Sequence, residues 1–154
     1  MSLFLTVFMI AHPMVTIHSD SPAGRAHPPR NVLIVDDDPL VVRAMNILLT
    51  RAVFQPIVCH SGAEALKKIR PEIAAAVLDI HLPDMNGLTL SQRLRPLMSP
   101  DAPIIILSGD HSIETIRALP DAGATCFFAK PVNGARLIEH LEEWLAIKKP
   151  RKSV

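Results

Sequence analysis

From residue 31 onward, short apolar runs alternate with longer stretches in which apolar residues recur at helical spacing. Near-continuous apolar runs such as AAAVLDI at 74–80 are typical of strands that a parallel sheet buries on both faces. Their alternation with helical stretches predicts an α/β domain with a parallel sheet and crossover helices. The expected strands are residues 31–35, 56–60, 74–80, 102–109 and 124–131, and the expected helices are 39–52, 61–69, 88–97, 112–119 and 133–147.

Local signals place the starts of two helices. Asp38 followed by Pro39 is a good N-cap with proline in the first helical position. Ser61 and Glu64 form the capping-box pattern that opens the second helix. The first helix is supported by four apolar residues at helical spacing: Leu40, Ala44, Ile47 and Leu48.

Composition limits the class of protein. A chain of 154 residues, 49% of them hydrophobic, fits one folded domain and can bury a core. The net charge of +1 gives no electrostatic case for direct binding of DNA or RNA. Cys59 and Cys126 are too few for a disulfide framework and lie in apolar runs, so we expect buried free thiols and a cytoplasmic location.

The two ends of the chain differ from its middle. Residues 3–11, LFLTVFMIA, resemble the apolar centre of a signal peptide, but no Lys or Arg precedes them and they are too short to span a bilayer. Three interpretations are open: a non-native start upstream of Met9 or Met14, a flexible extension, and a weak export signal. The expected organisation is a flexible extension over 1–30, one domain over 31–147 and a solvated basic tail over 148–154.

The segment VDDDP places three like charges directly after the first predicted strand. Two unit charges about 4 Å apart repel by roughly 1 to 4 kcal/mol, depending on the effective dielectric constant. Helix capping accounts for Asp38 alone. A bound cation is the most economical reason for Asp36 and Asp37.

Reactive groups also stand at the ends of the third, fourth and fifth predicted strands, as Asp79, Ser108 and Lys130. Ligands of parallel α/β sheets bind beyond the carboxyl ends of the strands, so we expect these groups at one edge with Asp36 and Asp37. Such carboxylates suit Mg²⁺ or Mn²⁺, and Asp79 is the natural nucleophile toward phosphorus. Lys130 would contribute positive charge and Ser108 a hydroxyl hydrogen bond. A plain surface lysine and simple turn chemistry are the ordinary alternatives for these two residues.

These motifs resemble those of response-regulator receiver domains, over about Asn31 to Ile147. The matching segments are VDDDP with the acidic pair, LDIHLPDMNG with Asp79 as phosphoacceptor, ILSG with Ser108, and GATCFFAKP with Lys130. The resemblance implies a flavodoxin-like, doubly wound parallel sheet of five strands in the order 2-1-3-4-5, flanked by five helices.

The resemblance also implies a metal site. Asp37 and Asp79 would hold the ion directly, together with the backbone carbonyl of His81. Asp36 would act mainly through water, and the imidazole of His81 would not be needed.

As a receiver, the chain would be a phosphoacceptor switch of a two-component system or phosphorelay, and not an enzyme. A sensor histidine kinase or a histidine phosphotransfer protein would phosphorylate Asp79, which adds about two negative charges there. The family couples this event to movement of Ser108 and to an inward swing of an aromatic residue that Phe127 matches. Phe127 lacks the hydroxyl of the more usual tyrosine, and ordinary strand packing is its alternative role.

The resemblance places the output surface on the fourth helix, fifth strand and fifth helix. Along the fifth helix, Leu141 and Leu145 are expected in the core. Trp144 is expected partly exposed, where it contributes to a homodimer or binds a partner; the alternative is that it covers more of the core. Only the basic tail follows residue 147, so we expect a stand-alone receiver. It would bind a downstream protein target or pass its phosphoryl group onward.

Two other functions are alternatives. Asp36-x-Asp38 resembles the nucleophile motif of haloacid-dehalogenase-type phosphatases, but that family needs a further acidic pair late in the chain, and residues 124–135 contain none. A pseudo-receiver that binds partners without accepting phosphate is the second alternative. Every chemical position of a receiver is filled, which favours a phosphorylated domain.

Overall fold

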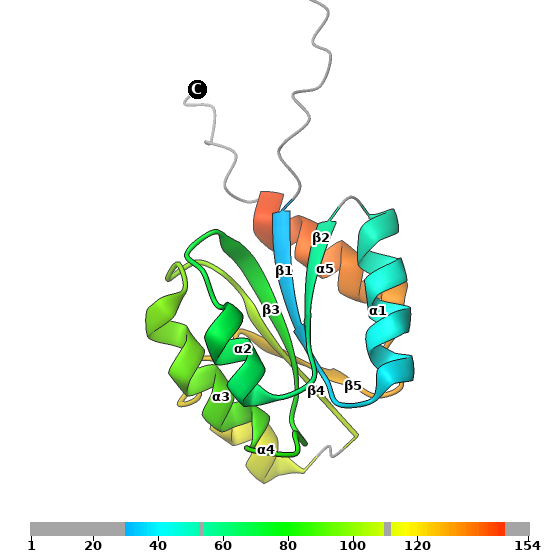
Figure 1. Cartoon of the computed structure of the whole chain (residues 1–154). Coiled ribbons are helices and arrows are strands. Elements are labelled where there is room, and N and C mark those ends of the chain that lie inside the picture. The colour runs from blue at the N-terminus through cyan, green and yellow to red at the C-terminus, as the bar shows by residue number, and fades with distance from the viewer. Residues whose placement is uncertain (1–29, 53, 110–111, 147–154) are drawn as a thin grey trace, which may run out of the picture.

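The computed structural model of the chain describes residues 30–52, 54–109 and 112–146, which form a five-stranded parallel sheet flanked by helices (Figure 1). The strands are β1 (Arg30–Val35), β2 (Phe54–Cys59), β3 (Ile73–Asp79), β4 (Ile104–Ser108) and β5 (Cys126–Ala129). The helices are α1 (Pro39–Arg51), α2 (Gly62–Lys68), α3 (Gly87–Leu94), α4 (Ile113–Ala118) and α5 (Gly134–Ala146), with a 3₁₀ turn, η1 (Arg95–Leu97), after α3. The strand order is β2-β1-β3-β4-β5, which confirms the predicted flavodoxin-like topology.

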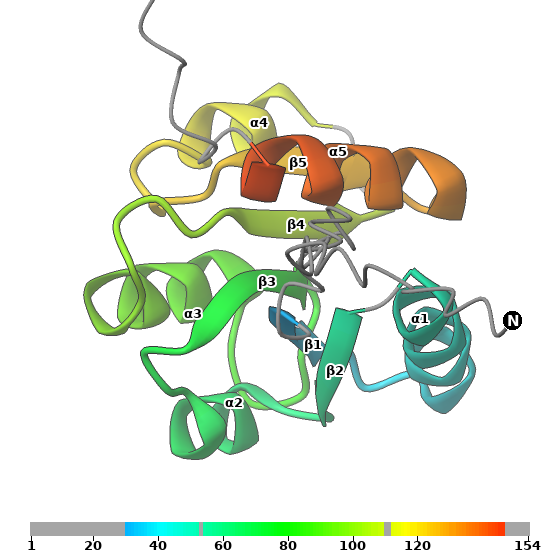
Figure 2. The same cartoon turned by 90° about the horizontal axis from the view of Figure 1, so that it is seen from above.

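Helices cover both faces of the sheet (Figure 2). α1 and α5 lie on one face, and α2, α3 and α4 lie on the other. Each face has its own hydrophobic cluster, with Met45, Leu49 and Leu137 on the α1–α5 side and Ala65 and Leu90 on the opposite side. Successive side chains of the central strands alternate between the two clusters, so these strands are apolar at nearly every position.

Side-chain caps explain where the helices begin. Asp38 Oδ1 accepts a hydrogen bond from the N–H of Leu40 at 2.8 Å, as the Asp-Pro pattern predicts. The predicted capping box is also confirmed, because Ser61 Oγ accepts from the Glu64 N–H at 3.1 Å and Glu64 Oε2 accepts from the His60 N–H at 2.7 Å. These bonds fix the points at which the chain leaves the carboxyl ends of β1 and β2.

The predicted first helix is confirmed as α1, but helical spacing alone does not identify the face that it buries. Leu40 and Ile47 are 75% and 45% exposed, whereas Val42, Met45 and Leu49 face the sheet. The helix carries apolar residues around much of its circumference, so helical spacing defines more than one stripe. The short connection from β1 sets how the helix is rotated, and this rotation decides which stripe is buried.

Several element boundaries also differ from the prediction. β1 begins at Arg30, inside the segment assigned to the extension, because Arg30 pairs with Phe54 of β2 and its guanidinium donates to the carbonyl of Leu145 in α5. β2 includes Pro56, which an edge strand accommodates. The helix expected over 88–97 is divided into α3 and η1.

Residues 1–29 of the extension predicted over 1–30, and the whole predicted tail over 148–154, lie outside the described residues. In the part of the chain that the structure describes, no helix combines the length and apolar character needed to cross a membrane. Cys59 is buried and Cys126 is partly buried, and both are free thiols. Burial raises the pKa of Cys59 to about 11 and that of Cys126 to about 12, so neither forms a thiolate readily at neutral pH.

Gly87 lies where α3 begins against the backbone of β3. A β-carbon at this position would be 2.2 Å from the carbonyl oxygen of Asp79. We predict that Gly87→Ala lowers the free energy of unfolding, measured by urea denaturation, by about 2 to 3 kcal/mol because the backbone must shift. Gly109→Ala is the matched control and should change stability by less than about 0.5 kcal/mol. Among the described residues, no atom other than those of its chain neighbours lies within 4 Å of a β-carbon there. Equal effects of the two substitutions would contradict this account.

Candidate functional site

Four strands end together at one edge of the sheet, at the lower end of β1 in Figure 1. Asp36 directly follows β1, and Asp79 is the last residue of β3. The strand register places Asp79 beside Leu107, and Ser108 beside Ala129, the residue before Lys130. The carboxyl ends of these strands therefore bring the predicted groups to the same level of the sheet.

Three aspartates form an acidic cluster at this edge. One carboxylate oxygen from each of Asp36, Asp37 and Asp79 lies within 4.8 Å of the other two. Asp36 and Asp79 are only 2% and 5% exposed, whereas Asp37 is exposed. The predicted acidic trio is thus brought together, with one carboxylate open to solvent.

Lys130 connects the two buried carboxylates. Its Nζ lies 2.8 Å from Asp36 Oδ2 and 3.0 Å from Asp79 Oδ1. The main-chain N–H of Lys130 donates a hydrogen bond to the Ser108 carbonyl at 2.9 Å, and this bond attaches the end of β5 to β4. Lys130 is therefore a member of the site and not a plain surface lysine.

The electrostatics of the site favour a bound cation. Burial raises the pKa of Asp79 above its ordinary value, and the charge of Asp36 raises it too, against the opposing hydrogen bonds from Lys130 and the His81 N–H. Burial alone would lower the pKa of Lys130, but its contacts with Asp36 and Asp79 outweigh burial and raise it. The lysine stays charged at neutral pH, and one ammonium group leaves three carboxylates with excess negative charge.

The loop between β3 and α3 borders the cluster. His81 and the following residues line, together with Asp37, an open cavity of about 460 Å³. The loop is closed by the hydrogen bond from the Gly87 N–H to the Ile80 carbonyl at 2.8 Å and by a bridge between His81 and Asn86. The predicted metal-ligating segment therefore lies beside the exposed carboxylate of Asp37.

Ser108 and Phe127 share one face of the sheet. Ser108 is completely buried at the end of β4, and Phe127 pairs in register with Ile106. Phe127 and Ile106 belong to the cluster on the α2–α4 side, and the two-residue period of a strand directs Ser108 to the same side as Ile106. This common face is the arrangement that coupling between the two residues would need.

The acidic cluster fits a hard divalent cation. Carboxylate and carbonyl oxygens are the ligands that Mg²⁺ and Mn²⁺ prefer, and Mg²⁺ keeps several of its waters when few protein ligands are present. Asp37, Asp79 and the main chain of His81 could hold such an ion, and Asp36 could contact its water shell. The open cavity beside Asp37 and His81 leaves this side of the cluster accessible from solvent.

Local sequence patterns do not reveal every residue of this region. Asn86 caps α3 by accepting from the Leu88 N–H at 2.8 Å, and an Asn before a predicted helix could have indicated this. Asp84 instead contacts the first turn of α2, 21 and 22 residues earlier in the chain. No local signal could have identified that contact.

The fold and the site define a flavodoxin-like α/β domain whose chemistry lies at the carboxyl edge of the sheet. The sequence model of the response regulator receiver domain matches residues 32–142, so this chain belongs to the response regulator receiver family. Receiver domains are switches of two-component signalling and bind Mg²⁺ at an acidic pocket.

Relatives and solved structures agree with this family. The chain is 34% identical to the sensory/regulatory protein RpfC of Xanthomonas campestris over 117 residues, 73% of this chain and 16% of RpfC. It is 38% identical to the transcriptional regulatory protein KdpE of Mycobacterium tuberculosis over 104 residues, 65% of this chain and 44% of KdpE. The chain thus spans less than half of each of these relatives. A CheY-like receiver domain protein from Methanospirillum hungatei is 32% identical, with a TM-score of 0.72 over 77% of this chain and 95% of that protein.

We predict that Asp79→Asn raises the thermal stability of the metal-free protein at neutral pH. The pKa of Asp79 is raised in the folded protein, so ionisation of this carboxyl destabilises the folded state as pH rises through that pKa. Asparagine cannot ionise. The gain should be present at neutral pH and should disappear as pH falls through the folded-state pKa, which thermal denaturation across the acid range measures. A less stable variant at neutral pH would contradict the argument.

Proposed function

We propose that this domain is a phosphoacceptor switch of a two-component system or phosphorelay. Asp79 accepts a phosphoryl group from a phosphohistidine of a sensor histidine kinase or a histidine phosphotransfer protein, in a reaction that depends on Mg²⁺ or Mn²⁺. The observation that supports this best is the contact of Lys130 Nζ with both Asp36 and Asp79 at the mouth of an acidic cluster.

The chain's own residues have distinct tasks in this reaction. A carboxylate oxygen of Asp79 attacks phosphorus, the P–N bond breaks, and the histidine nitrogen leaves with the electron pair. Lys130 holds Asp79 in place before the reaction and donates to a phosphoryl oxygen afterwards. Asp37, Asp79 and the His81 carbonyl would hold the metal ion, and Asp36 would act through water; the ion would neutralise charge on the phosphoryl oxygens.

Phosphorylation then changes a protein surface. Ser108 donates to the new phosphoryl group, and Phe127 moves into the space that opens on the same face of the sheet. The affected surface is formed by α4, β5 and α5, where Ile113 and Ile116 are 61% and 46% exposed. Since Phe127 has no hydroxyl, it fills this space by packing alone.

The same surface is the proposed contact for a downstream protein target or for a second copy of the chain. Trp144, half-buried on α5, extends this surface, and Leu141 and Leu145 are in the core as predicted. The domain acts in the cytoplasm, where such kinases deliver phosphate. It loses the phosphoryl group by hydrolysis at its own site, so it is a signalling switch and not a metabolic enzyme.

The phosphatase alternative is not favoured. It needs Asp36 and Asp38 as a working pair of carboxylates, but Asp38 Oδ1 is used to cap α1 through the Leu40 N–H, and Asp36 is paired with Lys130. A pseudo-receiver would need no phosphoryl acceptor at the site. Asp79 nevertheless occupies the acceptor position, with its Oδ1 3.0 Å from Lys130 Nζ.

We predict that acetyl phosphate and Mg²⁺ add one phosphoryl group to the protein, at Asp79, as detected by intact-mass and peptide mass spectrometry. Asp79→Asn should abolish the adduct because amide nitrogen and oxygen do not form an acyl phosphate. Asp121→Asn, an exposed aspartate before β5, is the matched control and should be labelled like the wild type. A label that survives Asp79→Asn but is lost in Asp36→Asn would favour the phosphatase, and no label on wild type would favour the pseudo-receiver.

We predict a change in Trp144 fluorescence when the protein is phosphorylated. Trp144 is the only tryptophan of the chain, and its ring lies 5.6 Å from that of His140, which contacts Phe128 of β5 at 5.3 Å. Movement of β5 should therefore alter its emission. Ser108→Ala should still form the adduct, at a reduced rate, but show a smaller change. An unchanged response in Ser108→Ala would contradict the proposed coupling.

A further inference from the structure

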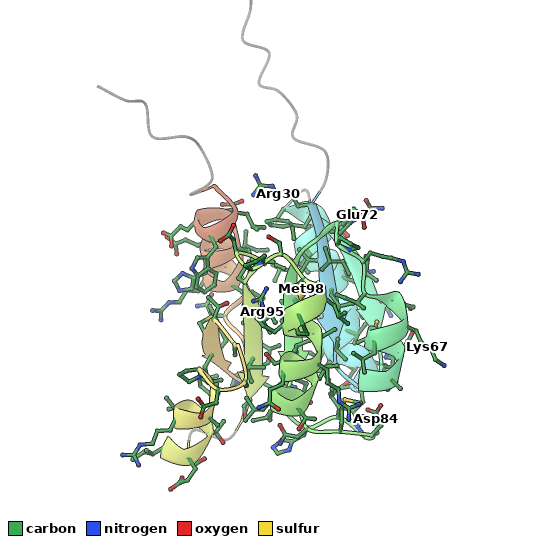
Figure 3. The ribbon with its side chains drawn as sticks, turned by 90° about the vertical axis from the view of Figure 1, so that its left-hand side faces the viewer. Arg30, Lys67, Glu72, Asp84, Arg95 and Met98 are labelled. Carbon is green, nitrogen blue, oxygen red and sulfur yellow. The ribbon has the colours of Figure 1, made fainter. Side chains whose placement is uncertain are left out.

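Asp84 connects the loop after the proposed phosphoacceptor to a different helix. It lies five residues beyond Asp79, and Figure 3 shows it at the end of the molecule below α2 and α3. Its Oδ1 accepts from the Gly62 N–H at 2.9 Å, and its Oδ2 accepts from the Ala63 N–H at 2.7 Å. Both carboxylate oxygens are thus used on the first turn of α2.

The helix has a cap of its own, so Asp84 is not needed for that purpose alone. Ser61 Oγ accepts from the Glu64 N–H, and the Ser61 carbonyl accepts from the Ala65 N–H at 3.1 Å. The two further bonds to Asp84 come from the loop. These two bonds also restrain the loop, because they attach a largely exposed segment, residues 81–86, to α2, which packs on the sheet.

A second contact, made by Met85, also holds the loop against the start of α2. Met85 packs over Gly62 so closely that a β-carbon on Gly62 would lie 2.5 Å from the Met85 sulfur. Met85 also packs against the hydrophobic cluster on this side of the sheet. Successive residues of the loop, one polar and one apolar, therefore hold it against the start of α2.

The other end of the loop is fixed to β3 and α3. The Gly87 N–H donates to Ile80, His81 bridges with Asn86, and Asn86 caps α3. Asp84 lies between these attachments, in the wall of the cavity that Asp37 and His81 also line. The position of the His81 main chain relative to Asp37 thus depends on how the loop is held on its α2 side.

We propose that Asp84 is a positioning residue of the phosphoacceptor site: by fastening the 81–87 loop to α2, it holds the His81 main chain where a divalent cation on Asp37 and Asp79 can reach it. This inference rests on the proposed function. Asp84 itself contacts neither phosphate nor metal, and it acts through the loop.

The test compares Asp84→Ala with Ser61→Ala in the full chain. Both remove hydrogen bonds from the start of α2, but only the first releases the loop. Asp84→Ala should weaken Mg²⁺ binding, measured by titration calorimetry, by about tenfold, as is usual when a group that orients a metal ligand is lost. Ser61→Ala should change the Mg²⁺ affinity less than about twofold. Asp84→Asn should restore part of the affinity, since its single carbonyl oxygen can accept from one of the two N–H groups.

Two further readouts separate positioning from general stability. In metal-free protein, Asp84→Ala should remove hydrogen-exchange protection from loop amides such as Gly87, which Ser61→Ala should leave protected. With acetyl phosphate, the slower phosphorylation of Asp84→Ala should recover when Mg²⁺ is raised about tenfold, since only metal affinity is reduced.

Equal weakening of Mg²⁺ binding by Asp84→Ala and Ser61→Ala would overturn the inference and leave Asp84 as a helix cap. Unchanged Mg²⁺ affinity in Asp84→Ala would overturn it too. If wild-type protein forms no adduct at Asp79, the proposed function fails, whereas the exchange of the loop amides in metal-free protein still decides whether Asp84 fastens the loop.

Discussion

Three carboxylates lie close together at the edge of the sheet, and a single ammonium group, that of Lys130, contacts two of them. Asp36 and Asp79 are almost fully buried, and Lys130 contacts both. One lysine cannot neutralise three carboxylates, so the metal-free site retains unfavourable charge. The two hydrophobic clusters that sandwich the sheet hold the strand ends in place against this repulsion. The same unfavourable charge is what makes the site attractive to a cation.

Topology is what makes this crowding achievable. Lys130 and Asp36 are 94 residues apart in the chain, yet β1, β3, β4 and β5 are consecutive in the sheet and parallel. Their carboxyl ends must therefore lie at one edge. The close approach of Gly87 to the β3 backbone then allows the next loop to turn directly beside Asp79. The fold and the site therefore depend on each other, because four of the strands that form the core also place the reactive groups at their carboxyl ends.

Much of the site could be predicted from the sequence because each reactive group ends an apolar run. Asp79 after AAAVL and Ser108 after a solid apolar block are visible without a structure. The buried stripe of α1 was not predictable in this way, since its apolar residues surround the helix and only packing selects Val42, Met45 and Leu49. The contact of Asp84 with α2 depends on how a loop and a distant helix pack, which no local pattern encodes.

The central claim is that a divalent cation binds between Asp37, Asp79 and the loop that begins at His81. The most direct measurement is paramagnetic broadening of backbone amide resonances by substoichiometric Mn²⁺, with Mg²⁺ as competitor. We expect selective broadening of amides at the carboxyl ends of β1 and β3 and in the 81–87 loop, reversed by Mg²⁺. Broadening that is weak and uniform, or centred away from this edge of the sheet, would contradict it.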